Sequence, residues 1–511
     1  KLKINETLPM WLIEDFQLIS LPEALRAIHL PKNSEELKAA QKRLGYEEVF
    51  CLSLASLLNK EDNKTEDALK IEFHQNLAKK FVGSLPFTLT DEQRYISWQI
   101  YKDIQNAEPM NRLIEGDVGS GKTVVALMAA LMVIHADKQT AFMAPTELLA
   151  RQHASTINNL LTPLKLEDKI VLLTGSLTQT QKSEVYRKIK NGQVKIIIGT
   201  QALLQSSVDM HSLALIIIDE QHRFGVDQRK TLMQKAGHMP HVLSLSATPI
   251  PRSLALTLYG ELEISQLKQL PSGRKPIKTK IIAQESIGRL YDSVIKEIDA
   301  GRQVFIVCPN ISINEESNVK STEEVYEETK LSKLGKYKIG LLHGKLKNID
   351  KNMVMKNFIN QEIDILVSTT VIEVGVDIPN ASVMIVHSSE RFGLAQLHQL
   401  RGRVGRGQHQ GYFYMLTQND SPALKRLRAL ESSSSGFELA ELDLELRGPG
   451  AIYGTLQHGA LDLRIANLSD RELITSAVTG ARKFIKKKEN LLQYKELAVK
   501  VNQLRTVSNL N

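Results

Sequence analysis

The chain has 511 residues, of which 42% are hydrophobic and 24% are charged. These proportions indicate a globular protein with large cores and about three domains of about 150 residues, and they exclude a disordered or fibrous chain. The longest apolar run, at 124–134, is shorter than the about 20 residues of a membrane-spanning helix. The only two cysteines, Cys51 and Cys308, are no disulfide framework. The net charge of +8 permits a nucleic-acid partner. We expect a cytoplasmic protein with no membrane partner.

Residues 1–80 have the pattern of helices. Asn33 is followed three residues later by Glu36, which predicts a capping box at the start of a helix. From about residue 110 the pattern changes to short, continuous apolar runs, which are typical of buried parallel strands. We expect such strands at 112–114, 140–144, 170–173, 195–199, 213–219 and 242–246.

The segment QLPSGRKPIK at 269–278 is rich in proline, glycine and basic residues, and predicts a linker. After it the same strand pattern returns, with strands expected at 304–308, 338–342, 364–368, 382–386 and 411–416. The acidic stretch at 312–329 predicts a solvated insertion with a helix. The sequence therefore predicts an α/β fold with two tandem lobes, each built on a parallel sheet, and a cleft between them.

The segment GDVGSGKT at 116–123 lies between an expected strand and an expected apolar helix. Its glycines let backbone N–H groups surround phosphates, and the helix N-terminus adds its positive end. We expect Lys122 to reach the outer phosphates and Thr123 to hold Mg²⁺. A chance match in a glycine-rich turn is the alternative, which the strand and helix on either side disfavour. The residues expected to bind ATP here are Gly116, Asp117, Val118, Gly119, Ser120, Gly121, Lys122 and Thr123.

The segment IIIDEQH at 216–222 places two carboxylates at the end of an apolar strand. Phosphoryl transfer depends on positioning and on charge neutralisation. We therefore expect Asp219 to hold Mg²⁺ and Glu220 to polarise the attacking water. A surface Asp-Glu pair is the alternative, but it does not explain why the pair ends a strand of isoleucines.

The second lobe contains QLRGRVGRG at 399–407. Arg403 and Arg406 are three residues apart and share one face if this segment is helical. Arginines presented to the γ-phosphate across the cleft stabilise the charge that develops there, so hydrolysis would depend on closure of the two lobes. Contact with a DNA phosphate is the alternative role for these arginines.

These segments resemble motifs of the superfamily 2 helicases. FTLTDEQ at 87–93 resembles the Q motif, and SATPIPRSLA at 246–255 resembles the motif that couples hydrolysis to lobe movement. Four further segments resemble motifs that contact the DNA strand or the nucleotide. They are APTELLARQH (144–153), GTQALL (199–204), LLHGKL (341–346) and STTVIEVGVD (368–377). The sequence DEQH, in place of DEAD, disfavours the large RNA-unwinding branch.

The resemblance implies roles for further residues. It implies that Gln93 reads adenine and that Asp377 faces the nucleotide. The DNA contacts that it implies come from Arg151, Thr200, His343 and Thr370. The residues that it implies for coupling hydrolysis to movement are Gln221, His222, Ser246 and Thr248.

Two segments narrow the resemblance to the RecG family. Residues 28–50 resemble its helical linker, and DLELRGPGAIYGTLQHG at 443–459 resembles the TRG motif shared by RecG and the transcription-repair coupling factor. RGPG and GTxQ favour RecG. The resemblance implies that Arg426 and Arg447 hold a helical hairpin and that Gln457 lies in the following loop, as a transmission between ATP and DNA movement. The alternative is that Arg447 caps a packed C-terminal tail.

The family resemblance divides the chain into four parts. They are a helical linker at 1–82, a first RecA-like lobe at 83–272, a second at 273–418, and the hairpin, loop and helical extension at 419–511. The family also has a wedge domain with an OB-fold before the linker, and no part of residues 1–82 reads as a small barrel. Because the chain begins with Lys1, we expect a fragment rather than a family member that lost this domain.

The resemblance implies an ATP- and Mg²⁺-dependent translocase on double-stranded DNA. In the family this motor regresses replication forks and migrates Holliday junctions in recombination and repair. We expect a monomer in the bacterial cytoplasm, with single-stranded-DNA-binding protein as a further partner. Two alternatives stay open: a transcription-coupled remodeller, which would need a polymerase-binding domain, and a nucleotide-gated DNA clamp without turnover.

Overall fold

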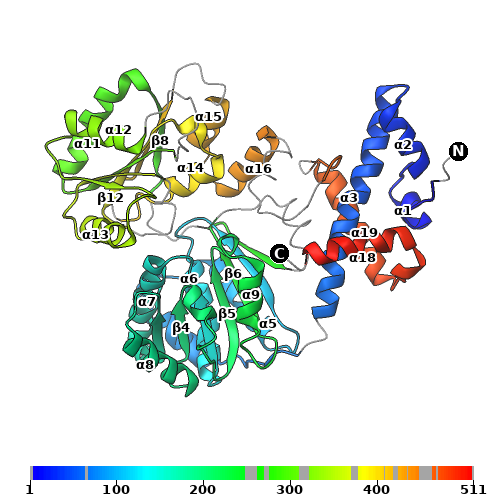
Figure 1. Ribbon diagram of the computed structural model, residues 1–511, viewed down its shortest axis with the longest axis horizontal. Coiled ribbons are helices and arrows are strands. Elements are labelled where there is room, and N and C mark those ends of the chain that lie inside the picture. The colour runs from blue at the N-terminus through cyan, green and yellow to red at the C-terminus, as the bar shows by residue number, and fades with distance from the viewer. Residues whose placement is uncertain are drawn as a thin grey trace.

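The structure is a computed structural model of the chain (Figure 1). It describes residues 4–63, 67–247, 262–269, 275–309, 321–369, 378–407, 409–417, 424–433, 435–447, 463–467 and 470–508. Two α/β lobes lie beside a separate group formed by the N-terminal and C-terminal helices. No helix within these ranges combines the length and apolarity that crossing a membrane requires.

The first lobe is built on a seven-stranded sheet with the order β3-β4-β2-β5-β6-β1-β7, in which every pairing is parallel. Its strands are β1 (Asn111–Gly116), β2 (Gln139–Met143), β3 (Ile170–Leu173), β4 (Ile196–Gly199), β5 (Leu213–Asp219), β6 (His241–Ser246) and β7 (Glu263–Leu267). Its helices are α4 (Gln75–Ser84), α5 (Asp91–Ile104), α6 (Lys122–His135), α7 (Glu147–Leu161), α8 (Gln179–Lys190) and α9 (Val226–Met233). The residues of α6 from Val124 to Val133 are all buried, so this helix lies inside the lobe.

The second lobe has a six-stranded parallel sheet with the order β10-β11-β9-β12-β13-β8. Its strands are β8 (Lys278–Ala283), β9 (Gln303–Val307), β10 (Ile339–Leu342), β11 (Ile365–Ser368), β12 (Ala381–Val386) and β13 (Tyr412–Thr417). Its helices are α11 (Ile287–Asp299), α12 (Thr322–Leu331), α13 (Asn348–Ile359) and α14 (Leu394–Arg401). The predicted fold of two lobes with parallel sheets is therefore confirmed.

The strands expected from continuous apolar runs are all present, with ends that differ by at most two residues. The sequence did not reveal β7 and β8, which lie at the edge of their sheets. β7 has only two buried residues and β8 has none, because an edge strand is covered less completely. The expected linker at 269–278 thus ends where β8 begins.

The N-terminal and C-terminal helices form one bundle. The long helix α3 (Ser34–Asn63) packs against α18 (Arg471–Lys486) and α19 (Lys495–Ser508), while α1 (Met10–Asp15) and α2 (Leu21–His29) lie at the same end of the molecule (Figure 1). Their shared core includes Tyr46, Phe50, Leu473, Phe484 and Leu497. The predicted cap of α3 is confirmed in part, since the Glu36 N–H donates to Asn33 Oδ1 at 2.8 Å. The Glu36 side chain accepts from the Lys32 N–H.

A helical hairpin follows the second lobe. It consists of α15 (Leu424–Ser432) and α16 (Gly436–Arg447), in line with the hairpin that the family resemblance implies. Leu427, Leu430 and Leu439 of the hairpin are buried in the same apolar cluster as Leu397 and Leu400 of α14. The hairpin therefore packs against α14 of the second lobe.

Candidate active site

The glycine-rich loop joins β1 to α6, in the arrangement expected from the sequence. Gly119 and Gly121 have φ of 85° and 87°, a region that side chains with a Cβ rarely adopt. A Cβ on Gly116 would lie 2.6 Å from Ser120 Oγ and 2.9 Å from Leu267 Cβ, so the loop leaves no space for a side chain there. Glycines at these positions therefore let the loop curve tightly at the N-terminus of α6.

Lys122 folds back over this loop. Its Nζ donates to the carbonyl oxygens of Gly116 at 2.7 Å and of Asp117 at 3.2 Å. Burial lowers the pKa of the Lys122 ammonium below its ordinary range, although the nearby Glu220 and Asp219 carboxylates oppose that shift. The buried Ser120 hydroxyl has no hydrogen-bond partner among the described residues. An ammonium, an unused hydroxyl and a helix N-terminus fit the phosphates of a nucleotide.

Asp219 and Glu220 lie at the carboxyl end of β5, and their surroundings shift the pKa values of the two carboxyl groups in opposite directions. Burial alone would raise the pKa of Asp219, but a 2.8 Å hydrogen bond with His153 Nε2 and the charge of Lys122 hold it below its ordinary value. Burial, followed by repulsion from Asp219, raises the pKa of Glu220. Glu220 also has a φ of 52°, which marks local strain in a residue other than glycine. The first carboxylate suits a cation, and the second suits a base.

Arg403 brings the second lobe to this site. Its side chain is buried, with an exposed residue fraction of 4%, and its charge affects the pKa of Lys122, Asp219 and Glu220. The helical arrangement considered for Arg403 and Arg406 is absent, because α14 ends at Arg401, Arg403 lies in the turn that follows, and Arg406 lies in irregular chain after it. Arg406 Nε instead donates to the Gly402 carbonyl at 3.0 Å.

The two lobes touch at the phosphate loop. A Cβ on Gly402 would lie 3.1 Å from Val118 Cβ, and His398 Nε2 lies 2.9 Å from Asp117 Oδ1. The structure therefore has the lobes closed around the residues expected to bind ATP.

Gln93, for which the resemblance implies adenine binding, lies against the phosphate loop. Its Nε2 donates to the Ser120 carbonyl at 2.8 Å, while its Oε1 accepts from the Thr90 N–H at 2.9 Å and completes the cap of α5. Both ends of the amide thus have partners within the protein, and adenine recognition by Gln93 stays a prediction.

The residues expected to couple hydrolysis to movement are described in part. Ser246 ends β6 and is paired in register with Glu115 of β1. Gln221 is buried in the short helix η4 (Gln221–Arg223), which also contains His222, whose side chain is not described. Arg426 NH2 donates to the Glu390 carbonyl at 2.6 Å and so joins α15 to the second lobe.

For several other expected residues, the structure does not describe the side chain or the whole residue. Arg447 ends α16, but its side chain is not described. Thr248, Thr370, Asp377 and Gln457 lie outside the described residues. Their assigned roles stay predictions.

Two of the described residues expected to contact DNA directly follow the carboxyl ends of strands, and the third lies on a helix. Thr200 follows β4 and His343 follows β10. Arg151 on α7 is half exposed, and its guanidinium donates to Glu147 Oε1 at 2.7 Å and Ser176 Oγ at 3.0 Å. The guanidinium is therefore held in place at the surface.

Sequence reasoning missed two histidines of the site. His153 contacts Asp219 and His398 contacts Asp117, across sequence separations of 66 and 281 residues. His153 ends the segment APTELLARQH, and His398 immediately precedes QLRGRVGRG. Their closeness to recognised segments is a weak signal, because nothing in either segment identifies the partner.

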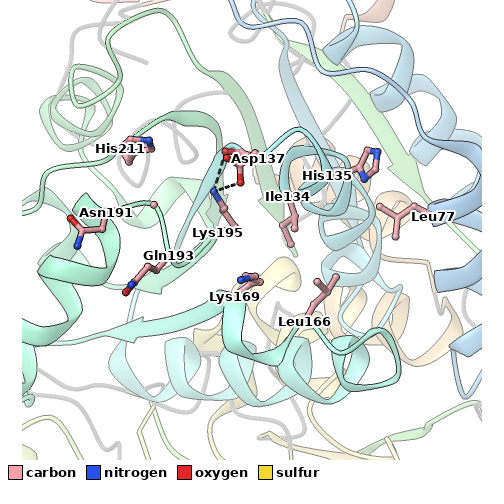
Figure 2. Close-up of a pocket in the computed structure, with 11 residues that line it drawn as sticks. Leu77, Ile134, His135, Asp137, Leu166, Lys169, Asn191, Gln193, Lys195 and His211 are labelled. Atoms are coloured by element: carbon pink, nitrogen blue, oxygen red, sulfur yellow. Dashed lines mark hydrogen bonds and ion pairs between the residues drawn. The ribbon is translucent and has the colours of Figure 1, made fainter.

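A separate cavity of about 470 Å³ lies at the end of the first sheet where the strands begin, away from the phosphate loop. It is near the starts of β2, β3 and β4 (Figure 2). Its lining includes Lys169, His135 and His211 together with an ion pair of Lys195 and Asp137, whose Nζ–Oδ1 distance is 2.5 Å. None of the residues predicted to bind ATP or DNA lines this cavity.

Known families match three parts of the chain. Residues 94–257 match the DEAD/DEAH box helicase family, residues 285–408 the helicase conserved C-terminal domain, and residues 433–511 the C-terminal part of domain 3 of the ATP-dependent DNA helicase RecG. The ATP-dependent DNA helicase RecG of Borreliella burgdorferi is 45% identical over 476 residues, which cover 92% of this chain and 68% of that protein. The chain belongs to the RecG family.

Other RecG proteins match the chain over a similar range. That of Synechocystis sp. is 43% identical over 504 residues, which are 98% of this chain and 60% of the relative. A solved structure of RecG bound to a three-way DNA junction has a TM-score of 0.79 and 39% identity, and the match covers 94% of this chain and 62% of that one. The chain thus spans between 60% and 68% of the length of these relatives.

Proposed function

We propose that this chain is the motor of an ATP-dependent translocase on double-stranded DNA that remodels branched DNA, by regressing forks and migrating Holliday junctions in recombination and repair. The observation that carries this proposal is Arg403. It comes from the second lobe, and its charge acts on Lys122, Asp219 and Glu220 of the first. A cation in this place stabilises the charge that develops on a transferred phosphoryl group. Hydrolysis then requires closed lobes.

The side chains divide the work of hydrolysis. Lys122 binds the outer phosphates, and Thr123 and Asp219 would hold Mg²⁺, which neutralises phosphate charge when it is bound. Glu220, whose pKa burial raises, orients and polarises the attacking water. Arg403 withdraws when the lobes open, and the site then loses its transition-state cation.

Branched DNA is the proposed substrate because a RecG relative of the same fold is bound to a three-way DNA junction. Arg151, Thr200 and His343 are the proposed backbone contacts within the described residues. We place the activity in the bacterial cytoplasm, in a monomer. Single-stranded-DNA-binding protein is the further partner that the family suggests.

Phosphate release with and without duplex DNA tests the proposal. Residues 1–511 should hydrolyse ATP faster with DNA, and DNA binding should weaken steeply with salt, because backbone contacts release counterions. Strand separation at forks should be poor, because the family resemblance places it in the wedge domain. Efficient fork-selective unwinding by this chain would place strand separation in the motor.

Substitution of Arg403 tests the observation that carries the proposal. Arg403→Ala should lower DNA-stimulated phosphate release by about a thousandfold, the lower end of what such an arginine contributes. Arg289→Ala, at an exposed position of α11, is the matched control and should keep the rate. An unchanged rate in Arg403→Ala would remove the basis of the assignment. ATP-dependent DNA binding without phosphate release would identify a clamp instead.

A further inference from the structure

Asp117 is a carboxylate of the phosphate loop that is directed at the second lobe and the hairpin. Its Oδ1 lies 2.9 Å from His398 Nε2 on α14, and the carboxylate also accepts from the backbone N–H of Gly436, the first residue of α16. Burial would raise its pKa, but these hydrogen bonds and the charge of Lys122 hold the pKa of Asp117 below its ordinary value. An ionised acceptor therefore joins three elements: the phosphate loop, α14 and α16.

The second nitrogen of His398 fixes its role in this contact. Arg401 NH2 lies 2.8 Å from His398 Nδ1. A guanidinium has only donors, so Nδ1 must be the acceptor and must carry no proton. The proton of the neutral imidazole then lies on Nε2 and is donated to Asp117. The imidazole thus accepts a hydrogen bond from Arg401 and donates one to Asp117.

Arg401 continues the path into the hairpin. Its NH1 donates to the carbonyl oxygens of Leu430 at 2.7 Å and Ser433 at 2.8 Å. These carbonyls lie at the C-terminal end of α15, where the last helical turn lacks partners of its own and where a cation is favourable. The hydrogen bonds therefore run from the phosphate loop through α14 to the end of α15, while Gly436 provides a direct bond to the start of α16.

We propose that Asp117, His398 and Arg401 form a positioning relay that makes closure of the lobes and seating of the α15–α16 hairpin a single event. Opening of the lobes would remove Asp117 from both of its donors, His398 Nε2–H and the Gly436 N–H. A hydrogen bond to a charged group contributes more stability than one between neutral groups. A buried donor left without a partner destabilises the protein further. His398 touches neither nucleotide nor reacting atoms in this scheme. It holds Arg403, five residues further on, in the closed site. The inference rests on the proposed function only for its consequence, which is coupling to DNA movement.

An inter-lobe distance measurement tests the relay independently of DNA movement. Cys51 and Cys308 are buried, so cysteines introduced at the exposed Glu184 on α8 and Glu327 on α12 can be labelled selectively. The distribution of distances between the labels is measured with a non-hydrolysable ATP analogue. His398→Ala should lower the ratio of closed to open molecules about tenfold, and hydrogen exchange of the Gly436 amide should accelerate by a similar factor.

Two variants separate the relay from a general structural effect. His398→Gln offers an amide N–H to Asp117 and a carbonyl to Arg401, and should restore most of the closed population. His409→Ala makes the same substitution at an exposed histidine of the second lobe and should leave both readouts unchanged. An unchanged distance distribution in His398→Ala, or equal defects in His398→Ala and His398→Gln, overturns the relay. Loss of DNA-stimulated hydrolysis in the unsubstituted chain would count against the proposed function and not against the relay.

Discussion

His153 Nε2 lies 2.8 Å from Oδ2 of Asp219, so a histidine of α7 holds the carboxylate that ends β5. The hydrogen bond occupies one oxygen of the carboxylate and fixes its orientation. Partners of this kind around a metal-binding carboxylate set the direction of its free oxygen and tune its affinity. The contact therefore connects the helix after β2 with the proposed Mg²⁺ ligand.

His153→Ala should raise the Mg²⁺ concentration needed for half-maximal ATP hydrolysis about tenfold, because Asp219 loses the group that orients it. Titration of the ATPase rate with Mg²⁺ at saturating ATP measures this. His29→Ala, at an exposed position of α2, is the control. An unchanged Mg²⁺ requirement in His153→Ala would mean that Asp219 is oriented without the histidine, or that it does not hold the metal.

Lys122→Ala should abolish ATP hydrolysis, while Glu220→Gln should bind ATP and retain it unhydrolysed. Lys122 supplies charge to the phosphates, whereas Glu220 acts on the water. Binding of a fluorescent ATP analogue and phosphate release, measured side by side, separate the two defects. Turnover by Glu220→Gln at the unsubstituted rate would show that another group positions the water.

Substitutions in the hairpin should uncouple the motor. Arg426→Ala removes the bond to the Glu390 carbonyl, and loss of such a charged hydrogen bond costs about 1.5–3 kcal/mol, enough to loosen a small element without unfolding a lobe. Arg447→Ala and Gln457→Ala are predicted to act in the same way. All three should keep the melting temperature and DNA-stimulated hydrolysis but lose branch migration. A parallel fall of stability, hydrolysis and branch migration would indicate a structural role only.

Glu47 should control the stability of the helical bundle. Its carboxylate accepts from the buried Arg43 at 2.7 Å, from Thr7 at 2.6 Å and from Lys500 at 2.5 Å. Burial opposes ionisation, but the charges of Arg43 and Lys500 prevail and lower the pKa of Glu47 below its ordinary value of 4.5. A lowered pKa stabilises the folded state above the unfolded-state pKa, and this stability is lost as the pH falls through the lower folded-state pKa.

Glu47→Gln should therefore reduce the free energy of unfolding of the bundle by roughly 1.5–3 kcal/mol at neutral pH, because the buried Arg43 guanidinium loses one of its two carboxylate partners and keeps only Glu6. The fluorescence of Trp11 reports on the bundle during urea unfolding when Trp98 is replaced by phenylalanine. Glu14→Gln, at an exposed position of α1, changes the charge equally and should cost much less. Equal effects of the two substitutions would contradict a buried ion-pair cluster.

The sequence by itself determined the features that depend on local backbone geometry and on periodicity. The glycines of the phosphate loop, the carboxylates that end β5 and the continuous apolar runs of the buried strands were all recognisable, because each is encoded within a few neighbouring residues. The family also followed from such segments. The edge strands β7 and β8 escaped recognition because a partly covered strand does not need a continuous apolar run.

Only the tertiary structure decided which groups meet. Asp117 and His398 are 281 residues apart, and Lys500 reaches Glu47 across 453 residues. Arg403 reaches the site from a turn, because α14 ends before it. Contacts of this kind depend on how whole lobes pack and on the path of the chain between them. A local pattern specifies the conformation of a segment, but a polar side chain takes its partner from whatever the fold places within about 3 Å.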